Sequence, residues 1–201
     1  MKKLLVYCLL VLVNLNLYAQ EKTDGKKILS QTIYQSKLPN GLNVVSVPFE
    51  SPGVASFFIL VRVGSREEVE AGKTGFAHFF EHMMFRGTEK YSKEQYSEIL
   101  KSIGAAANAN TSLDRTLYHM TGNANMLDKM FELEADRFMN LKYSVQDFKT
   151  EAGAVKGEYT KNYSNALQKL YEATLDTAFE SHTYKHTTMG FFKDVVDMPN
   201  Q

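Results

Sequence analysis

The sequence predicts an α+β fold in which a mostly antiparallel sheet is covered by helices, as a two-layer sandwich. A Pro39-Asn40-Gly41 turn lies between two short apolar segments, which is typical of a β-hairpin. A second hairpin pattern follows later in the chain, and after residue 126 the apolar residues recur near helical spacing. Strands that come early, with helices mostly grouped after them, favour a sheet with a helical layer.

Five strands are expected. Residues 31–47 predict two short strands around the first turn, and residues 54–63 (VASFFILVRV) predict a third, apolar enough to be central in the sheet. The charged residues 64–72 then predict a surface loop. Residues 106–122 alternate small, polar and β-branched types around a turn at 112–115, which predicts the second hairpin.

Helices are expected in the intervals between and after these strands. A helix from Thr74 to Arg86 has Thr74 as a plausible N-cap and Gly87 where a helix would stop. Ser92 and Gln95 resemble a capping box that opens a helix ending near Ile103. Three further helices are predicted at about 126–141, 145–163 and 166–179.

Residues 1–20 have the layout of a secretory signal peptide. Lys2 and Lys3 precede an apolar run from Leu4 to about Val13, and Ala19 suits cleavage. A membrane span needs about 20 apolar residues, so no stable span is expected after cleavage, and an uncleaved anchor is the minor alternative. We therefore expect an exported protein, periplasmic or extracellular.

Composition excludes several classes of function. The only cysteine, Cys8, leaves with the signal peptide, so the mature part contains no disulfide and no cysteine nucleophile. Loss of Lys2 and Lys3 takes the basic count from 23 to 21 against 23 acidic residues, and nothing in this balance points to nucleic acid. Residues 21–201 are long enough for one domain with a core of its own.

The segment HFFEH, residues 78–82, has the spacing of a zinc site. On a helix His78 and His82 lie one turn apart, and Glu81 projects within the same arc of about 100°. Two imidazoles at this spacing can hold one zinc ion, while the glutamate activates a zinc-bound water without binding the metal. The order His-x-x-Glu-His is the inverzincin signature.

A helix that merely buries two histidines is the alternative for so short a motif. The flanking side chains favour the metal, because a buried carboxylate is costly without a cation or a role. They are all apolar: Phe76, Phe79, Phe80, Met83, Met84 and Phe85.

A catalytic zinc needs a third protein ligand and an open position, and Glu158 is the candidate. Glu151 lies two helical turns earlier on the same face, where it could orient a ligand histidine. A solvated helix face is the alternative for both glutamates. Gly153 and Gly157 cost about 1 kcal/mol each in a helix, so this helix is expected to pack tightly through its glycines or to be kinked.

Three other histidines are rival ligands. His182 and His186 are also four residues apart, but their segment is rich in threonine and tyrosine and a surface loop is the expected structure. His119 alternates with an apolar residue in the second hairpin and is expected to be a polar strand residue.

Several blocks together resemble one family of zinc peptidases. LPNGLNVVSV, VRVGSREEVEAGKTGFAHFFEHMMFRGTEKYS, NANTSLDRTLYHM and EAGAVKGEY occur in the order found in the pitrilysin and insulin-degrading-enzyme family. The resemblance implies one zinc per chain bound by His78, His82 and Glu158, with Glu81 as the general base and Glu151 as the supporting acid. It also implies a substrate-binding edge strand, which carries over onto Asn108, Ala109, Asn110 and Thr111.

The resemblance implies a zinc-dependent endopeptidase that hydrolyses peptides or small unfolded proteins. Members of this family close the active site between two related halves, so residues 21–201 are expected to be the N-terminal catalytic half, with a second half or homologous subunit as partner. The ending GFFKDVVDMPNQ, read as a polar turn without a closing helix or strand, agrees with this expectation. A non-catalytic peptide-binding or partner subunit of the same fold and a structural zinc domain are the alternatives.

Overall fold

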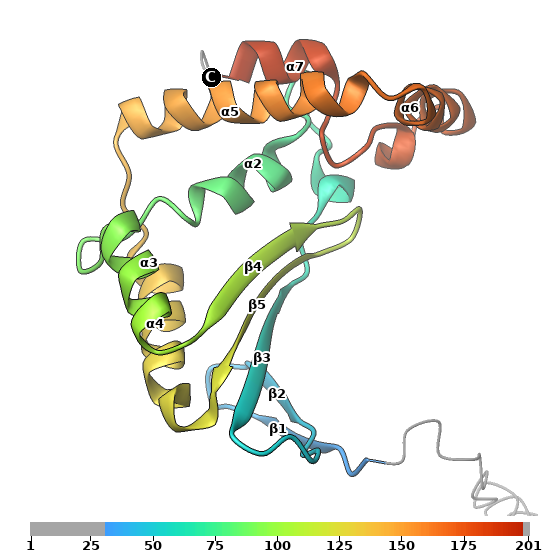
Figure 1. The fold of residues 1–201 in the computed structure, drawn as a ribbon. Helices are drawn as coiled ribbons and strands as arrows, with labels where there is room; N and C mark the ends of the chain where they lie inside the picture. The colour runs from blue at the N-terminus through green and yellow to red at the C-terminus, as the bar shows by residue number, and fades with distance from the viewer. Residues whose placement is uncertain (1–30, 199–201) are drawn as a thin grey trace, which may run out of the picture. The chain divides into compact units, whose positions relative to one another are not determined.

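The computed structural model of the chain describes residues 31–198 (Figure 1). The predicted signal peptide, residues 1–20, lies outside these described residues. The described residues fall into two units, one that ends at Glu50 and one that begins at Ser51. Within 31–198, every helix is too short or too polar to cross a membrane.

The described part of the first unit is a β-hairpin, as predicted. Strand β1 (Tyr34–Lys37) pairs antiparallel with β2 (Asn43–Ser46). The turn between them is closed by a hydrogen bond of 2.8 Å from the backbone N–H of Leu38 to the carbonyl of Leu42. Gly41 has φ +92°, a conformation that a residue with a Cβ adopts only with strain.

The second unit contains an antiparallel sheet in the order β3-β5-β4 (Figure 1). Its strands are β3 (Val54–Val61), β4 (Ala106–Thr111) and β5 (Thr116–Asn123). The predicted second hairpin is thus confirmed. The third predicted strand is not central in this sheet, because β5 pairs on both sides and β3 pairs only with β5 among the described strands.

The two faces of this sheet differ. Tyr118 and Met120 are buried on the face that α4 (Leu127–Asn140) covers, where the Phe57 and Phe131 rings lie 4.9 Å apart. Alternate residues of β3 project from the opposite face, so Phe58 is 61% exposed. The apolar run of β3 therefore reflects side chains on both faces rather than a central position.

The helices follow the predicted order. They are η1 (Ser65–Glu67), α2 (Phe76–Met83), α3 (Lys93–Ser102), η2 (Ala124–Met126), α4, α5 (Val145–Tyr163), α6 (Ala166–Ala178), η3 (Thr183–Lys185) and α7 (Phe192–Asp197). The Ser92–Gln95 capping box at α3 is present, with hydrogen bonds in both directions.

Helix α2 begins two residues later than predicted, because Thr74 has a different partner. The Thr74 hydroxyl donates to the buried carboxylate of Asp194 over 2.6 Å and accepts from the backbone N–H of Phe191 over 2.7 Å. Gly75 is the N-cap instead, with φ +88°. A Cβ on Gly75 would lie 2.7 Å from the carbonyl oxygen of Met189, so only glycine fits there.

Two segments expected at the surface are partly buried. In the predicted surface loop, Ser65 is fully buried at the start of η1. Residues 192–197, which were expected to belong to a polar turn, instead form α7, and its Val195 is 1% exposed. Apolar side chains of this short helix are buried in the core. The sequence pattern alone did not predict this burial.

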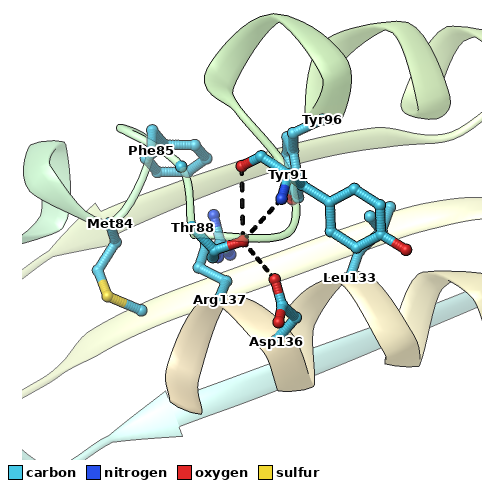
Figure 2. Close-up of a pocket in the computed structure, with 9 residues that line it drawn as sticks. Met84, Phe85, Thr88, Tyr91, Tyr96, Leu133, Asp136 and Arg137 are labelled. Atoms are coloured by element: carbon cyan, nitrogen blue, oxygen red, sulfur yellow. Dashed lines mark hydrogen bonds between the residues drawn. The ribbon is translucent and has the colours of Figure 1, made fainter. Parts of the chain in front are cut away.

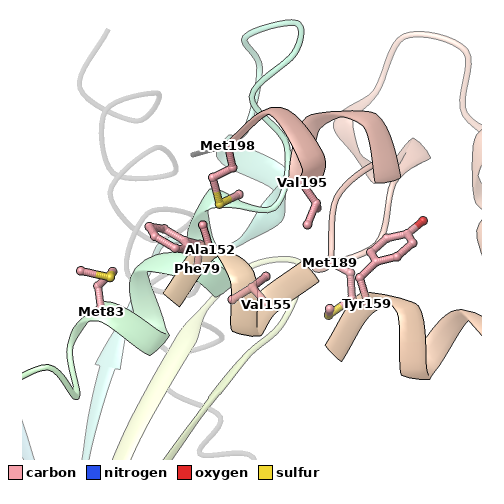
Figure 3. Close-up of a cluster of buried hydrophobic side chains, with 8 residues drawn as sticks. All are labelled: Phe79, Met83, Ala152, Val155, Tyr159, Met189, Val195 and Met198. Atoms are coloured by element: carbon pink, nitrogen blue, oxygen red, sulfur yellow. The ribbon is translucent and has the colours of Figure 1, made fainter. Parts of the chain in front are cut away.

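A cluster of buried side chains joins α2, α5 and the α7 region (Figure 3). Helix α2 packs against the sheet through β4 and β5 and against α5 on its other side (Figure 1). Burial of each Phe, Met or Val side chain here stabilises the fold by about 1.5–3 kcal/mol. The cluster contains Phe79, Met83, Ala152, Val155, Tyr159, Met189, Val195 and Met198.

Helix α5 runs without a break from residue 145 to residue 163. A Cβ on Gly153 or Gly157 would meet no atom of the structure within 4 Å, so tight packing through these glycines is not present in the described chain. The core contacts of α5 come from a different face, which includes Ala152 and Val155.

Candidate metal centre

The HFFEH segment lies on α2, which the buried cluster holds against α5. The carboxylate of Glu68 accepts hydrogen bonds from the backbone N–H groups of Gly75 (2.8 Å) and Ala77 (2.7 Å), at the N-terminal end of the helix. These bonds satisfy two of the donors that a helix start leaves free. Burial raises the pKa of the Glu68 carboxyl to about 7.

Three side-chain atoms converge on one point between α2 and α5. The Nε2 atoms of His78 and His82 are 3.3 Å apart, and Oε2 of Glu158 lies 3.4 Å from Nε2 of His82 and 3.8 Å from Nε2 of His78. Ligand atoms around a tetrahedral zinc with bonds of about 2.0–2.1 Å are separated by about 3.3–3.4 Å. Two of the three separations match this spacing and the third is longer, and the two imidazoles and the carboxylate are ligand types that zinc binds.

This is the one group of three or more potential metal ligands among residues 31–198. The Glu158 side chain is 39% exposed, whereas that of His78 is 12% exposed, so the site opens to solvent on the α5 side. Burial, and after it the neighbouring His82, lowers the pKa of the His78 imidazole, which favours the neutral ring that binds a metal.

Glu151 lies where the sequence analysis placed it, behind a proposed ligand. Its Oε1 is 2.8 Å from Nδ1 of His82, and its side chain is 12% exposed. With the carboxylate as acceptor, Nδ1 carries the proton and Nε2 faces Glu158 and His78 with its lone pair. The other carboxylate oxygen forms an ion pair with Arg86.

Sequence reasoning missed Arg86. The only signal was a cation four residues after His82, at the end of an apolar stretch. Its partner comes from α5, 65 positions away, and no local pattern links the two.

Glu81 lies on the sheet side of α2 and outside the triangle of proposed ligands. Its Oε2 accepts a hydrogen bond of 2.5 Å from the hydroxyl of Thr111, at the end of β4. A second contact extends this network, since the Thr111 and Thr116 hydroxyls are 3.4 Å apart. A carboxylate held beside a metal centre without binding the metal suits a general base.

The four residues of the predicted substrate strand lie along β4. Among the described strands β4 pairs only with β5, which leaves its outer edge available for strand addition. The backbone N–H of Ala109 donates to the side-chain oxygen of Asn108 over 2.9 Å, so a peptide that pairs there would displace this contact. Asn110 accepts from Arg115 and Thr111 donates to Glu81, and these two side chains alternate across the sheet.

The rival histidines are not part of the candidate metal centre. His186 is 2% exposed rather than in a surface loop, and its Nδ1 is 3.0 Å from the carbonyl oxygen of Thr187, which it can reach as donor. His182 accepts from the backbone N–H of Tyr184 and caps η3. His119 is a polar residue of β5 beside Phe58, as expected.

Known proteins with similar sequences are named as peptidases. The zinc protease PqqE of Helicobacter pylori is 37% identical over 160 residues, covering 79% of this chain and 36% of that protein. The beta subunit of the mitochondrial-processing peptidase of Rattus norvegicus is 30% identical over 155 residues, covering 76% of this chain and 31% of that subunit.

A solved structure is similar as well. The crystal structure of a protease from Helicobacter pylori matches with a TM-score of 0.79 and 35% identity, covering 83% of this chain and 40% of that one. The chain thus spans less than half the length of these relatives. The profile of the insulinase family, peptidase family M16, matches residues 44–190. The chain belongs to this peptidase family.

Proposed function

We propose that this chain is the catalytic part of a zinc-dependent endopeptidase that hydrolyses peptides or small unfolded proteins. One observation carries the proposal. Three ligand atoms of His78, His82 and Glu158 converge within 4.8 Å of one another, and Glu81 lies next to them but is held by Thr111. Ligands and base are therefore separate groups, as hydrolysis requires.

Each side chain has a distinct task in this reaction. Zinc, when bound, would supply polarisation of the scissile carbonyl and a lower pKa for a water molecule. Glu81 takes the proton from the attacking water and delivers it to the leaving amine. The Thr111 hydroxyl occupies Oε2 of Glu81, which leaves Oε1 to receive that proton. Glu151 keeps His82 in the tautomer that binds the metal.

The substrate proposal rests on the edge of β4. An extended peptide that pairs with Asn108–Thr111 would run past Thr111, whose hydroxyl contacts Glu81. Main-chain hydrogen bonds of this kind bind peptides with little regard to sequence, which suits a peptidase for unfolded chains.

Partners and location belong to the same proposal. The relatives are more than twice as long as the matched region, and one of them is named as a subunit. We infer that a second peptidase half or a homologous subunit completes the active site. The signal-peptide pattern of residues 1–20 supports export to the periplasm or the extracellular space.

Two other functions fit less well. A non-catalytic partner subunit would have no use for Glu81 beside the ligand triangle. A structural zinc site uses four protein ligands, and the group in residues 31–198 has three, with one side open to solvent.

Replacement of the base tests the proposal. Glu81→Gln should keep zinc and lower peptide hydrolysis by about a hundredfold or more, because Gln cannot take a proton. Zinc content and cleavage of a quenched-peptide library are measured on the same samples of the complete protein. A Glu81→Gln protein that cleaves as fast as the wild type would refute the assigned mechanism.

A further inference from the structure

Arg86 lies at the end of a line of contacts that leads to a proposed zinc ligand. Its guanidinium Nη2 pairs with Oε2 of Glu151, and Oε1 of the same carboxylate is 2.8 Å from Nδ1 of His82. Each oxygen of Glu151 thus has its own donor. Because two donors on two oxygens fix the plane of a carboxylate, the orientation of the His82 ring depends on Arg86.

The Arg86–Glu151 pair is shielded from water. The two side chains are 16% and 12% exposed. Exposed ion pairs contribute little, but removal of one partner from a buried pair leaves the other charge uncompensated. Without Arg86, the Glu151 carboxylate would turn toward solvent or toward other donors, and its bond to His82 would weaken.

The loop after α2 holds Arg86 in place. Gly87 has φ +107°, and a Cβ there would lie 2.9 Å from the backbone nitrogen of Lys93, so the turn requires glycine. The Thr88 hydroxyl donates to Asp136 on α4 (Figure 2). The backbone N–H of Thr88 donates to the carbonyl of Tyr91 over 2.8 Å. Hydrogen bonds therefore fix the loop to α4 and to the residues just before α3.

We propose that Arg86 is a positioning residue that sets the orientation of His82 for zinc through Glu151. The inference rests on the proposed function in that His82 is taken as a zinc ligand. A positioning role and the effect of charge alone change the zinc affinity in opposite directions. Loss of a cation near a metal site should by itself strengthen zinc binding, whereas loss of a positioning group should weaken it.

Zinc affinity, measured by chelator competition on the full chain, tests the proposal. Arg86→Met should bind zinc about tenfold more weakly than the wild type. Glu151→Gln should also weaken zinc binding. Adding Arg86→Met to Glu151→Gln should change the affinity by less than about twofold, because Arg86 then has no Glu151 carboxylate through which to act on His82. Arg66→Met is the matched control: it removes the same charge from a side chain that is 47% exposed, and its affinity should stay within about twofold.

Circular dichroism of each variant separates folding from zinc binding. Unchanged or tighter zinc binding by Arg86→Met would overturn the inference. An equal loss of zinc affinity on adding Arg86→Met to the wild type and to Glu151→Gln would overturn it as well. If Arg86→Met does not fold, Arg86→Lys carries the test, since lysine keeps the charge but cannot reproduce the planar guanidinium. A loss of about tenfold or more that disappears in the Glu151→Gln background supports the inference; any other result overturns it. A wild type that binds no zinc would instead refute the proposed function, and the inference with it.

Discussion

Substitution of Glu68 by Gln should change how stability depends on pH. Burial raises the pKa of this carboxyl from its ordinary value of 4.5 to about 7, against the effect of the backbone N–H bonds from Ala77 and Gly75. The negative charge of Asp194 acts in the same direction as burial. His186 also faces the group, with its Nδ1 3.7 Å from Oε2 of Glu68.

The sign follows from the raised pKa. The folded protein holds the Glu68 proton more tightly than the unfolded chain does, so this contribution to stability is complete below about pH 4.5 and is lost as the pH rises through about 7. At about 1.4 kcal/mol per pKa unit, the contribution is about 3 kcal/mol. Gln does not titrate, so Glu68→Gln should gain about this amount relative to the wild type between pH 5 and pH 8.

Urea unfolding of both proteins at several pH values, with a chelator present to remove metal, measures the difference in free energy of unfolding. Glu70→Gln is the control, because Glu70 lies in the same loop with its side chain 67% exposed. The control difference should stay within about 0.5 kcal/mol at every pH. A constant difference between Glu68→Gln and the wild type across this range would refute the reasoning.

Two further predictions concern α5 and the completeness of the chain. Gly153→Ala should stabilise the fold by about 1 kcal/mol, because the added Cβ meets open space in a regular helix. Gly53→Ala has equal space, but Gly53 has φ +77°, so this variant should be destabilised by about 1–2 kcal/mol. Thermal unfolding compares the two variants, and equal effects on stability would contradict this view of the backbone. The 201-residue chain alone should bind zinc but cleave peptides poorly, because loss of even one preorganised donor can cost about a hundredfold to a thousandfold in rate. Zinc-dependent cleavage that stays proportional to enzyme at low concentration would show that one copy suffices.

Local patterns predicted most of the secondary structure. The Asn40-Gly41 turn and the Ser92–Gln95 capping box depend on neighbours within a few residues, and both elements formed as expected. The proposed cap at Thr74 failed because Asp194, 120 positions away, offers its hydroxyl a buried partner. Contacts between residues so far apart in the sequence cannot be predicted from a local pattern.

In the candidate site too, local spacing predicted some neighbours, whereas others depend on tertiary contacts. His78, Glu81 and His82 share one face of a helix, so their proximity follows from sequence spacing. Glu158 and Glu151 were candidates whose roles the family resemblance assigned, and the structure places both against these histidines. The partners of Glu151 and Glu81, namely Arg86 and the Thr111 hydroxyl, depend on how α5 and β4 pack around α2, which the sequence could not specify.

The zinc content of purified protein shows whether His78, His82 and Glu158 form a metal site. We expect one zinc per chain in the wild type and a clear loss of zinc in both His82→Ala and Glu158→Gln, because each removes one of three ligand atoms that lie within 4.8 Å of one another. Lys142→Gln, which alters an exposed ion pair with Glu89, is the control and should keep its zinc. A full equivalent of zinc in either ligand variant would contradict the assigned metal site.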